Sequence, residues 1–79
     1  MKPLGFIYLT TNTVNGKIYI GQHEFVDNKK KNASYLGSGV ILLRAIKKYG
    51  RDKFFRKILR ICYSVEELNK WEEYYIFLL

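Results

Sequence analysis

The sequence predicts a small domain of the α+β class, and three observations support this prediction. Two runs rich in aromatic and β-branched residues, Phe6–Thr10 and Lys17–Gly21, flank a polar turn and are typical of a β-hairpin. A third run, Phe54–Tyr63, predicts another strand. Apolar residues at helical spacing follow Ser38 and Ser64, which indicates two amphipathic helices.

The chain has 79 residues, of which 48% are hydrophobic, so we interpret it as one folded domain. Its single cysteine, Cys62, excludes an intramolecular disulfide and indicates a reducing, cytoplasmic compartment; we expect it to be a small buried residue. There is no signal peptide and no apolar run near the roughly 18 residues that span a bilayer, so no membrane partner is expected. Because the chain stops inside an apolar helix, we expect it to be the N-terminal part of a longer protein or to be completed by a partner.

Lys and Arg outnumber Asp and Glu by 14 to 7, which gives a formal net charge of +7. Nucleic acid is the first partner to consider, because Lys and Arg contacts to phosphates release counterions and give sequence-independent affinity. An anionic membrane surface is a weaker second candidate, because neither helix pairs its apolar face with an extended lysine-rich flank. The remaining alternative is a basic domain without a polyanionic partner.

Side chains alternate along a strand, so the hairpin has two faces of different chemistry. One face is apolar and carries Ile7, Leu9, Ile18 and Ile20. The other face carries Phe6, Tyr8, Lys17, Tyr19 and His23. A hairpin that only forms a core does not need this second set, so the second face is our candidate for chemistry.

Two registers of the hairpin stay open at this point. Asn15-Gly16 favours a two-residue type I′ turn, which would place Asn12 opposite Tyr19. A four-residue loop would instead bring Tyr8 opposite Tyr19. Both registers leave the two tyrosines on the same face, because side chains alternate with a period of two.

The polar segment Glu24–Ser34 shows neither helical nor strand periodicity, and we expect it to be a mobile surface loop. Its basic run is either a solvated segment or a set of phosphate contacts, and consists of Lys29, Lys30 and Lys31.

The helix after Ser38 is expected to have that serine as its N-cap and Gly50 as its left-handed C-terminal cap. Its apolar stripe consists of Leu42, Ala45, Ile46 and Tyr49. A basic stripe on the other side consists of Arg44, Lys48 and Arg51. The Gly-Ser-Gly turn at 37–39 either caps the helix or also holds a phosphate on its backbone N–H groups.

The last helix is expected to start at Ser64, with Glu67 at the capping-box position. At about 100° per residue, Glu72 falls inside the apolar sector, whereas its neighbour Glu73 falls on the opposite, polar side. That sector consists of Val65, Leu68, Trp71, Tyr75, Ile76, Leu78 and Leu79. A buried carboxylate is costly unless it is paired or binds a metal. Glu72 therefore marks either a structural ion pair with Arg or Lys, or a functional site.

Several segments resemble the GIY-YIG nucleases, in the order and at the separations of that family. Phe-Ile-Tyr at 6–8 and Tyr-Ile-Gly at 19–21 resemble its two signature tripeptides. Tyr-Leu-Gly-Ser-Gly, Ala-Ile-Lys-Lys-Tyr-Gly and Glu-Glu-Tyr-Tyr-Ile, at 35–39, 45–50 and 72–76, are similar to its phage-type, homing-endonuclease-like branch. The resemblance implies a three-stranded antiparallel sheet flanked by helices, and metal-dependent cleavage of double-stranded DNA in a bacterial or phage-infected cell.

The resemblance also implies roles for single residues. Tyr8 and Tyr19 match the signature tyrosines near the scissile phosphate, of which the first is a favoured general base. Glu72 matches the glutamate that binds a single divalent metal ion, Mg²⁺ or Mn²⁺. His23 resembles a histidine of some branch members, and Tyr35 occupies a neighbouring polar position. The side chains expected to contact DNA are Lys17, Lys29, Lys30, Lys31, Tyr35, Ser38, Lys48 and Arg51.

The sequence departs from the family pattern in two places. Phe6 stands where the family has glycine, and the arginine expected soon after Tyr-Ile-Gly is missing, since no arginine precedes Arg44. Arg44, a lysine from 29–31, or His23 is expected to replace it, although lysine lacks arginine's bidentate fork. The alternative function is a non-catalytic DNA-binding domain with the same fold. Homing-type relatives take their specificity from a separate C-terminal region, which this chain does not contain.

Overall fold

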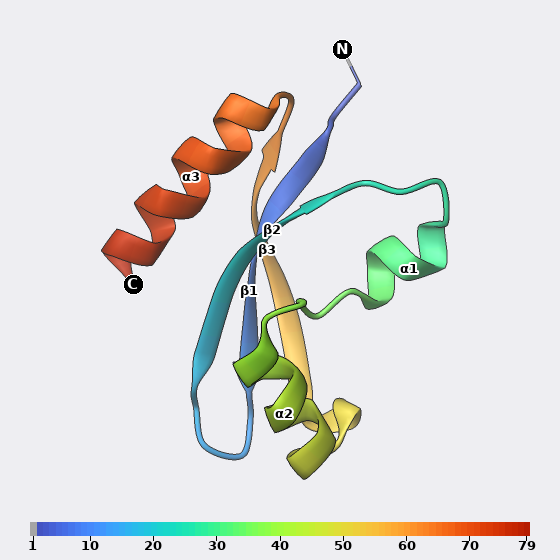
Figure 1. Cartoon of the computed structure of the whole chain (residues 1–79), viewed down its shortest axis with the longest axis vertical. Coiled ribbons are helices and arrows are strands. Elements are labelled where there is room, and N and C mark those ends of the chain that lie inside the picture. The colour runs from blue at the N-terminus through green and yellow to red at the C-terminus, as the bar shows by residue number, and fades with distance from the viewer. Residues whose placement is uncertain (1) are drawn as a thin grey trace.

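The computed structural model describes residues 2–79, which form an α+β domain with one sheet, as predicted (Figure 1). The described elements, in chain order, are β1 (Gly5–Asn12), β2 (Ile18–Glu24), α1 (Lys29–Ser34), α2 (Val40–Tyr49), the 3-10 turn η1 (Arg51–Lys53), β3 (Phe54–Cys62) and α3 (Val65–Leu78).

The sheet has the strand order β2-β1-β3, and β1 pairs antiparallel with both neighbours. This confirms the three-stranded antiparallel sheet that the resemblance implied. Because β1 is central, its side chains are the most completely buried, with Phe6 and Ile7 at 1% and 0% exposure. The pairing with β3 shifts between Ile7 and Tyr8, so that Leu59 has no partner across the strands.

Both predicted registers of the hairpin are wrong. Tyr19 lies opposite Thr10, two residues from either predicted partner, and Tyr8 lies opposite Gly21. The buried Asn12 explains the difference, because its side-chain oxygen accepts a hydrogen bond of 2.9 Å from the Val14 N–H and shapes the turn. The prediction that both tyrosines share a face holds, because a shift of two residues leaves the side-chain alternation unchanged.

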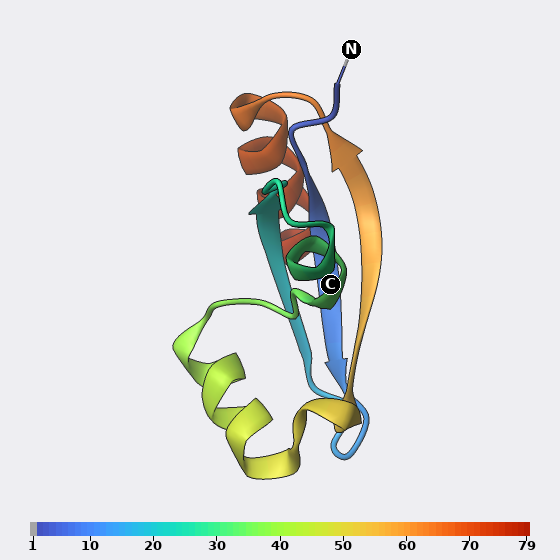
Figure 2. The same cartoon turned by 90° about the vertical axis from the view of Figure 1, so that its right-hand side faces the viewer.

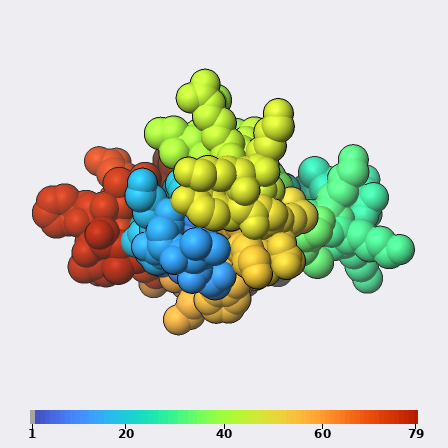
Figure 3. Space-filling view, turned by 90° about the horizontal axis from the view of Figure 1, so that it is seen from below, coloured from blue at the N-terminus to red at the C-terminus, as the bar shows by residue number. Residues whose placement is uncertain are grey.

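Helices α1 and α3 lie on opposite sides of the sheet (Figures 1 and 2). In the view toward the β1–β2 turn, α3 and α1 project to opposite sides of the molecule, and α2 lies between them (Figure 3). The core beneath α3 contains Ile7, Cys62 and Leu68, so the expected burial of Cys62 is confirmed. Partly buried residues packed against this core are Leu4, Ile20, Leu59, Trp71 and Tyr75.

The predicted apolar sector of α3 is too wide. Leu68 is buried and Trp71 and Tyr75 are half-buried, because these side chains face the sheet. The other members are exposed, at Val65, Ile76, Leu78 and Leu79. The expected cap is present: Ser64 Oγ accepts from the Glu67 N–H at 3.1 Å. The Glu67 carboxylate accepts from the N–H of Tyr63 instead of that of Ser64.

Two predictions about the middle of the chain need correction. The expected loop at 24–34 contains the short helix α1, which Asn28 caps by accepting from the Lys31 N–H at 3.1 Å. The helix buries no residue, and so it leaves no apolar period in the sequence. The N-cap of α2 is Gly39 instead of Ser38, and no side chain caps this end. Leu42 is buried as predicted, and Gly50 ends the helix with a positive φ of 93°, although its ψ of 143° lies outside the left-handed helical region that was expected. Arg51 belongs to η1 instead of α2.

The ring of Tyr8 crosses the backbone of β2 at a glycine. A Cβ atom built on Gly21 would lie 2.3 Å from the Tyr8 hydroxyl, and one built on Gly37 would lie 3.0 Å from it. Only a residue without a side chain leaves room for the ring at these two positions. Gly37 also has φ +135°, which disfavours any other residue.

We therefore expect Gly21→Ala to displace Tyr8 and to lower the free energy of unfolding by about 1–3 kcal/mol, the usual cost of overpacking. Urea unfolding followed by tyrosine fluorescence measures this change. Gly39→Ala is the matched control, because a Cβ atom there meets nothing within 4 Å. Equal stability of the two variants would contradict the close packing of Tyr8 on Gly21.

Candidate functional site

Three of the predicted site residues come together on the face of the sheet that α3 leaves free. The rings of His23 and Tyr35 are stacked, with centroids 4.0 Å apart and planes inclined by 26°. Tyr8 meets the edge of Tyr35 at 5.5 Å. Phe6 lies beneath them, 5.2 Å from His23. We call Tyr8, His23 and Tyr35 the aromatic cluster.

The phenol of Tyr8 is buried, with 6% of the residue exposed. Burial raises the pKa of this phenol well above its usual value, and the neighbouring Tyr35 phenol and the Glu72 carboxylate raise it further. Tyr8 therefore stays protonated at neutral pH and can donate a hydrogen bond from its hydroxyl.

His23 is held by the side chain of Asn32, a residue that sequence reasoning missed. Its Nε2 atom lies 2.9 Å from Asn32 Oδ1. The same amide is bound to the backbone of Val26, since Oδ1 accepts from its N–H at 3.0 Å and Nδ2 donates to its carbonyl at 2.7 Å. Asn32 thus ties α1 to the end of β2.

Arg56 is a second residue that was missed. Arg56 lies on β3, opposite Thr10 of β1. Its guanidinium donates to the backbone carbonyls of Asn32 and Tyr35 at 2.7 and 2.9 Å. The guanidinium also lies over the ring of Phe6, 4.7 Å from its centroid, and partial burial lowers its pKa. Strand alternation could have placed Arg56 on the face of Tyr8 once the β1–β3 register was known.

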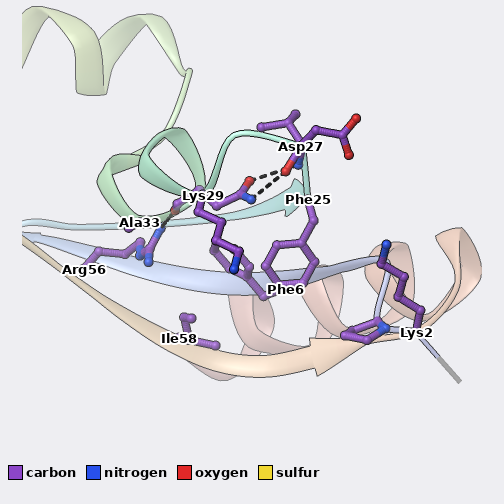
Figure 4. A pocket seen from close by; sticks show the side chains of 11 residues that line it. Lys2, Phe6, Phe25, Asp27, Lys29, Ala33, Arg56 and Ile58 are labelled. Atoms are coloured by element: carbon purple, nitrogen blue, oxygen red, sulfur yellow. Dashed lines mark hydrogen bonds between the residues drawn. The ribbon is translucent and has the colours of Figure 1, made fainter.

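Two hollows adjoin this region. The larger, of about 630 Å³, has mostly apolar walls that include Phe6, Phe25 and Ile58, with Lys2, Lys29 and Arg56 around them (Figure 4). The smaller, of about 290 Å³, contains His23 and Tyr35 of the aromatic cluster. Its lining also includes Lys31 and Arg51, whose side chain donates to the carbonyl of Ser34. The structure thus brings two of the predicted DNA contacts next to the cluster.

Apart from Lys29, which lines the larger hollow, the other predicted contacts lie away from the aromatic cluster. Arg44 and Lys48 are exposed on α2, and the Nζ atom of Lys48 lies 5.2 Å from the ring centroid of Tyr49. Lys17, Lys30 and Ser38 are exposed, and no described side-chain contact joins them to the cluster. Tyr19 is half-buried farther along the same face, in a hollow with the first residues of α2.

Glu72 lies on the other side of β2 and is half-buried, whereas its neighbour Glu73 is exposed. The helical angles therefore distinguished the two glutamates correctly. The expectation of a fully buried carboxylate is wrong, and the contact described for Glu72 is with an amide instead of Arg or Lys. Gln22 Nε2 donates to Asn69 Oδ1 at 2.9 Å and lies 3.4 Å from Glu72 Oε1.

Within residues 2–79 there is no group of three or more His, Cys, Asp and Glu side chains that could surround a metal ion. A metal at Glu72 would therefore have one carboxylate as its protein ligand among the described residues and water elsewhere. Such oxygen donors suit a hard, largely hydrated cation such as Mg²⁺. In the described part of the chain, no helix is long and apolar enough to span a membrane.

Comparison with known proteins agrees with the resemblance. The family model described as "Putative endonuclease segE, GIY-YIG domain" matches residues 1–79. The chain is 48% identical over 68 residues to "Putative endonuclease segE" of Enterobacteria phage T4, covering 86% of this chain and 32% of that relative. It is 45% identical over 58 residues to "Endonuclease segA" of the same phage, covering 73% of this chain and 25% of that relative.

The chain therefore spans about a third or less of the length of these relatives. No solved structure matches it significantly. The family match covers the signature tyrosines, the aromatic cluster and Glu72 alike. This full-length match, with identities above 40% to the phage T4 relatives, shows that the chain belongs to the segE family of GIY-YIG domains.

Proposed function

We propose that this domain is the catalytic part of a DNA endonuclease that hydrolyses phosphodiester bonds with the help of a divalent metal ion. The observation that carries the proposal is the aromatic cluster, which gathers Tyr8, His23 and Tyr35 beside Lys31 and Arg51. The names of the phage relatives support the reaction class. A net charge of +7 supports a polyanionic substrate.

The cations beside the cluster would take the place of the missing family arginine. Lys31 and Arg51 line the same hollow as His23, whereas Arg44 lies on the exposed side of α2. Both cations would neutralise charge on the phosphate that approaches the cluster. Outer phosphate contacts would come from Lys17, Lys29, Lys30, Ser38 and Lys48, and from Tyr19 beside the start of α2.

Proton transfer would fall to His23. Tyr8 is a poor base, because its raised pKa keeps the phenol protonated; it would instead donate a hydrogen bond to a phosphate oxygen. Imidazole is the side chain that ordinarily changes its protonation between pH 5 and 8. Glu72 would hold Mg²⁺ or Mn²⁺, which supplies positive charge to the phosphate and the leaving oxygen.

Glu72→Gln is expected to lower the rate of Mg²⁺-dependent nicking of supercoiled DNA about 100-fold or more, because it removes the one carboxylate that could hold the cation. DNA binding, measured by gel retardation, should persist. Glu73→Gln is the matched control, since this neighbour is exposed and has the same charge. Wild-type nicking by Glu72→Gln would contradict this role, and wild-type chain that retards DNA without nicking it would support the non-catalytic alternative.

His23→Ala is expected to slow single-turnover cleavage by about 10²–10⁴-fold, the usual contribution of a general base. In the wild type the rate should fall as the pH drops through the pKa of the imidazole, because the protonated ring cannot accept a proton. The variant should lack this dependence. A pH–rate profile of each protein tests this, and an acid limb that survives in His23→Ala would exclude His23 as the base.

The raised pKa of Tyr8 also predicts that the folded domain loses stability at alkaline pH. Its folded-state pKa lies above the ordinary value of about 10, so the stability that it contributes is complete below pH 10. That contribution is lost as the pH rises through the folded-state pKa. Tyr8→Phe should therefore show a weaker fall of the free energy of unfolding above pH 10 than the wild type, measured by urea unfolding. Parallel curves would show that the phenol is not buried as described.

A further inference from the structure

The amide of Asn32 has a defined orientation. Its two ends are bound to one residue, because Oδ1 accepts from the Val26 N–H and Nδ2 donates to the Val26 carbonyl. Rotating the amide by 180° would place two donors together at the N–H and two acceptors together at the carbonyl. The atom that faces His23 is therefore the oxygen.

An amide oxygen only accepts hydrogen bonds, so the His23 nitrogen at 2.9 Å must donate. This nitrogen is Nε2. A neutral imidazole carries a single N–H, and the proton on Nε2 leaves Nδ1 with a free lone pair. No hydrogen bond to Nδ1 is described within residues 2–79. Asn32 thus selects the tautomer of His23 and determines which nitrogen is free to accept a proton.

The imidazole cannot easily turn to exchange its two nitrogens. One face stacks on Tyr35 at 4.0 Å, and Phe6 lies 5.2 Å away. Arg56 braces Asn32 and Tyr35, because its guanidinium donates to the backbone carbonyls of both residues. Rotating the ring would break the Asn32 bond inside this braced arrangement.

The charged and titratable groups around His23 come from every element packed on it. β1 contributes Tyr8, the segment after α1 contributes Tyr35, and β3 contributes Arg56. Lys31 of α1 and Arg51 of η1 line the same hollow. Among residues 2–79 no hydrogen bond joins the His23 ring to a carboxylate, so the orientation of the ring depends on the neutral amide of Asn32.

We propose that Asn32 is the positioning residue of the site: it holds His23 with Nδ1 free, and Nδ1 accepts the proton of the attacking water. This inference rests on the proposed function. In the step, the water oxygen bonds to phosphorus while its proton moves to Nδ1. The bond from phosphorus to the leaving sugar oxygen breaks, and that oxygen takes a proton from solvent. The imidazolium keeps its Nε2–H bond to Asn32 throughout.

The chain has one histidine, so ¹⁵N NMR of the imidazole reports on His23 alone. At high pH the wild-type ring is expected to be wholly in the Nε2–H form. Asn32→Asp retains an acceptor for Nε2 but adds a negative charge, which should raise the imidazole pKa by about 1 unit or more. The acid limb of the cleavage profile should move to higher pH by the same amount.

Asn28→Asp is the matched control, because it adds the same charge at the exposed cap of α1, where aspartate also caps well. It should leave the His23 titration nearly unchanged. Asn32→Leu, which cannot accept a hydrogen bond, should return the ring to a mixture of tautomers and slow cleavage about tenfold. A merely structural role for Asn32 would slow cleavage without moving the acid limb in Asn32→Asp.

Failure of this inference can be told apart from failure of the proposed function. A wild-type chain that nicks DNA but has its imidazole proton on Nδ1 would overturn the inference alone. Equal His23 pKa values in Asn32→Asp and Asn28→Asp would do the same. A chain with the expected Nε2–H ring that nicks no DNA would overturn the proposed function and, with it, the proton-accepting role of Nδ1.

Discussion

The close approach of the Tyr8 ring to the backbone of β2 is the constraint on which the rest of this site depends. A side chain at the centre of a sheet normally packs beside its neighbours on the next strand, whereas this ring passes over Gly21 and ends near Gly37. Two glycines from separate parts of the chain thus enclose one hydroxyl group. Because this hydroxyl is buried, its pKa is raised, and in the proposed mechanism Tyr8 would donate a hydrogen bond instead of acting as a base.

A second constraint keeps the segment after β2 in place. Helix α1 buries no residue and has only six residues, too few to be stable in isolation. Its position comes from polar contacts: Asn32 binds Val26 and His23, while Arg56 binds the carbonyls of Asn32 and Tyr35. These contacts hold α1 with Lys31 beside the aromatic cluster, and Arg51 reaches the same hollow from η1 by donating to the carbonyl of Ser34. Part of the positive charge of the chain therefore lies next to the residues proposed to act in catalysis.

Features that depend on the periodicity of side chains were predicted correctly from the sequence. Features that depend on single polar contacts, such as the hairpin register and α1, were predicted wrongly or missed. The shared face of Tyr8 and Tyr19 follows from the period of two and survives the wrong register, and helical angles alone separated Glu72 from Glu73. The register itself depends on the Asn12 side chain, which no pattern of apolar residues reveals. Arg56 was visible as a strand residue, but its face depends on a pairing shift near Tyr8. Helix α1 has no apolar stripe, so its existence and the role of Asn32 could only come from the structure.

The edge strand β2 joins the two halves of the proposed site through adjacent residues. Gly21 points to the face where Tyr8 lies, and the next residue, Gln22, points to the face of α3, where it lies 3.4 Å from Glu72. A slip of one residue in this strand would put Gln22 against Tyr8 and remove the glycine from the crossing. The Glu72 carboxylate is also among the causes that raise the Tyr8 pKa, although the two groups belong to opposite faces. A cation held at Glu72 would reverse that influence, because a positive charge favours the ionised phenol.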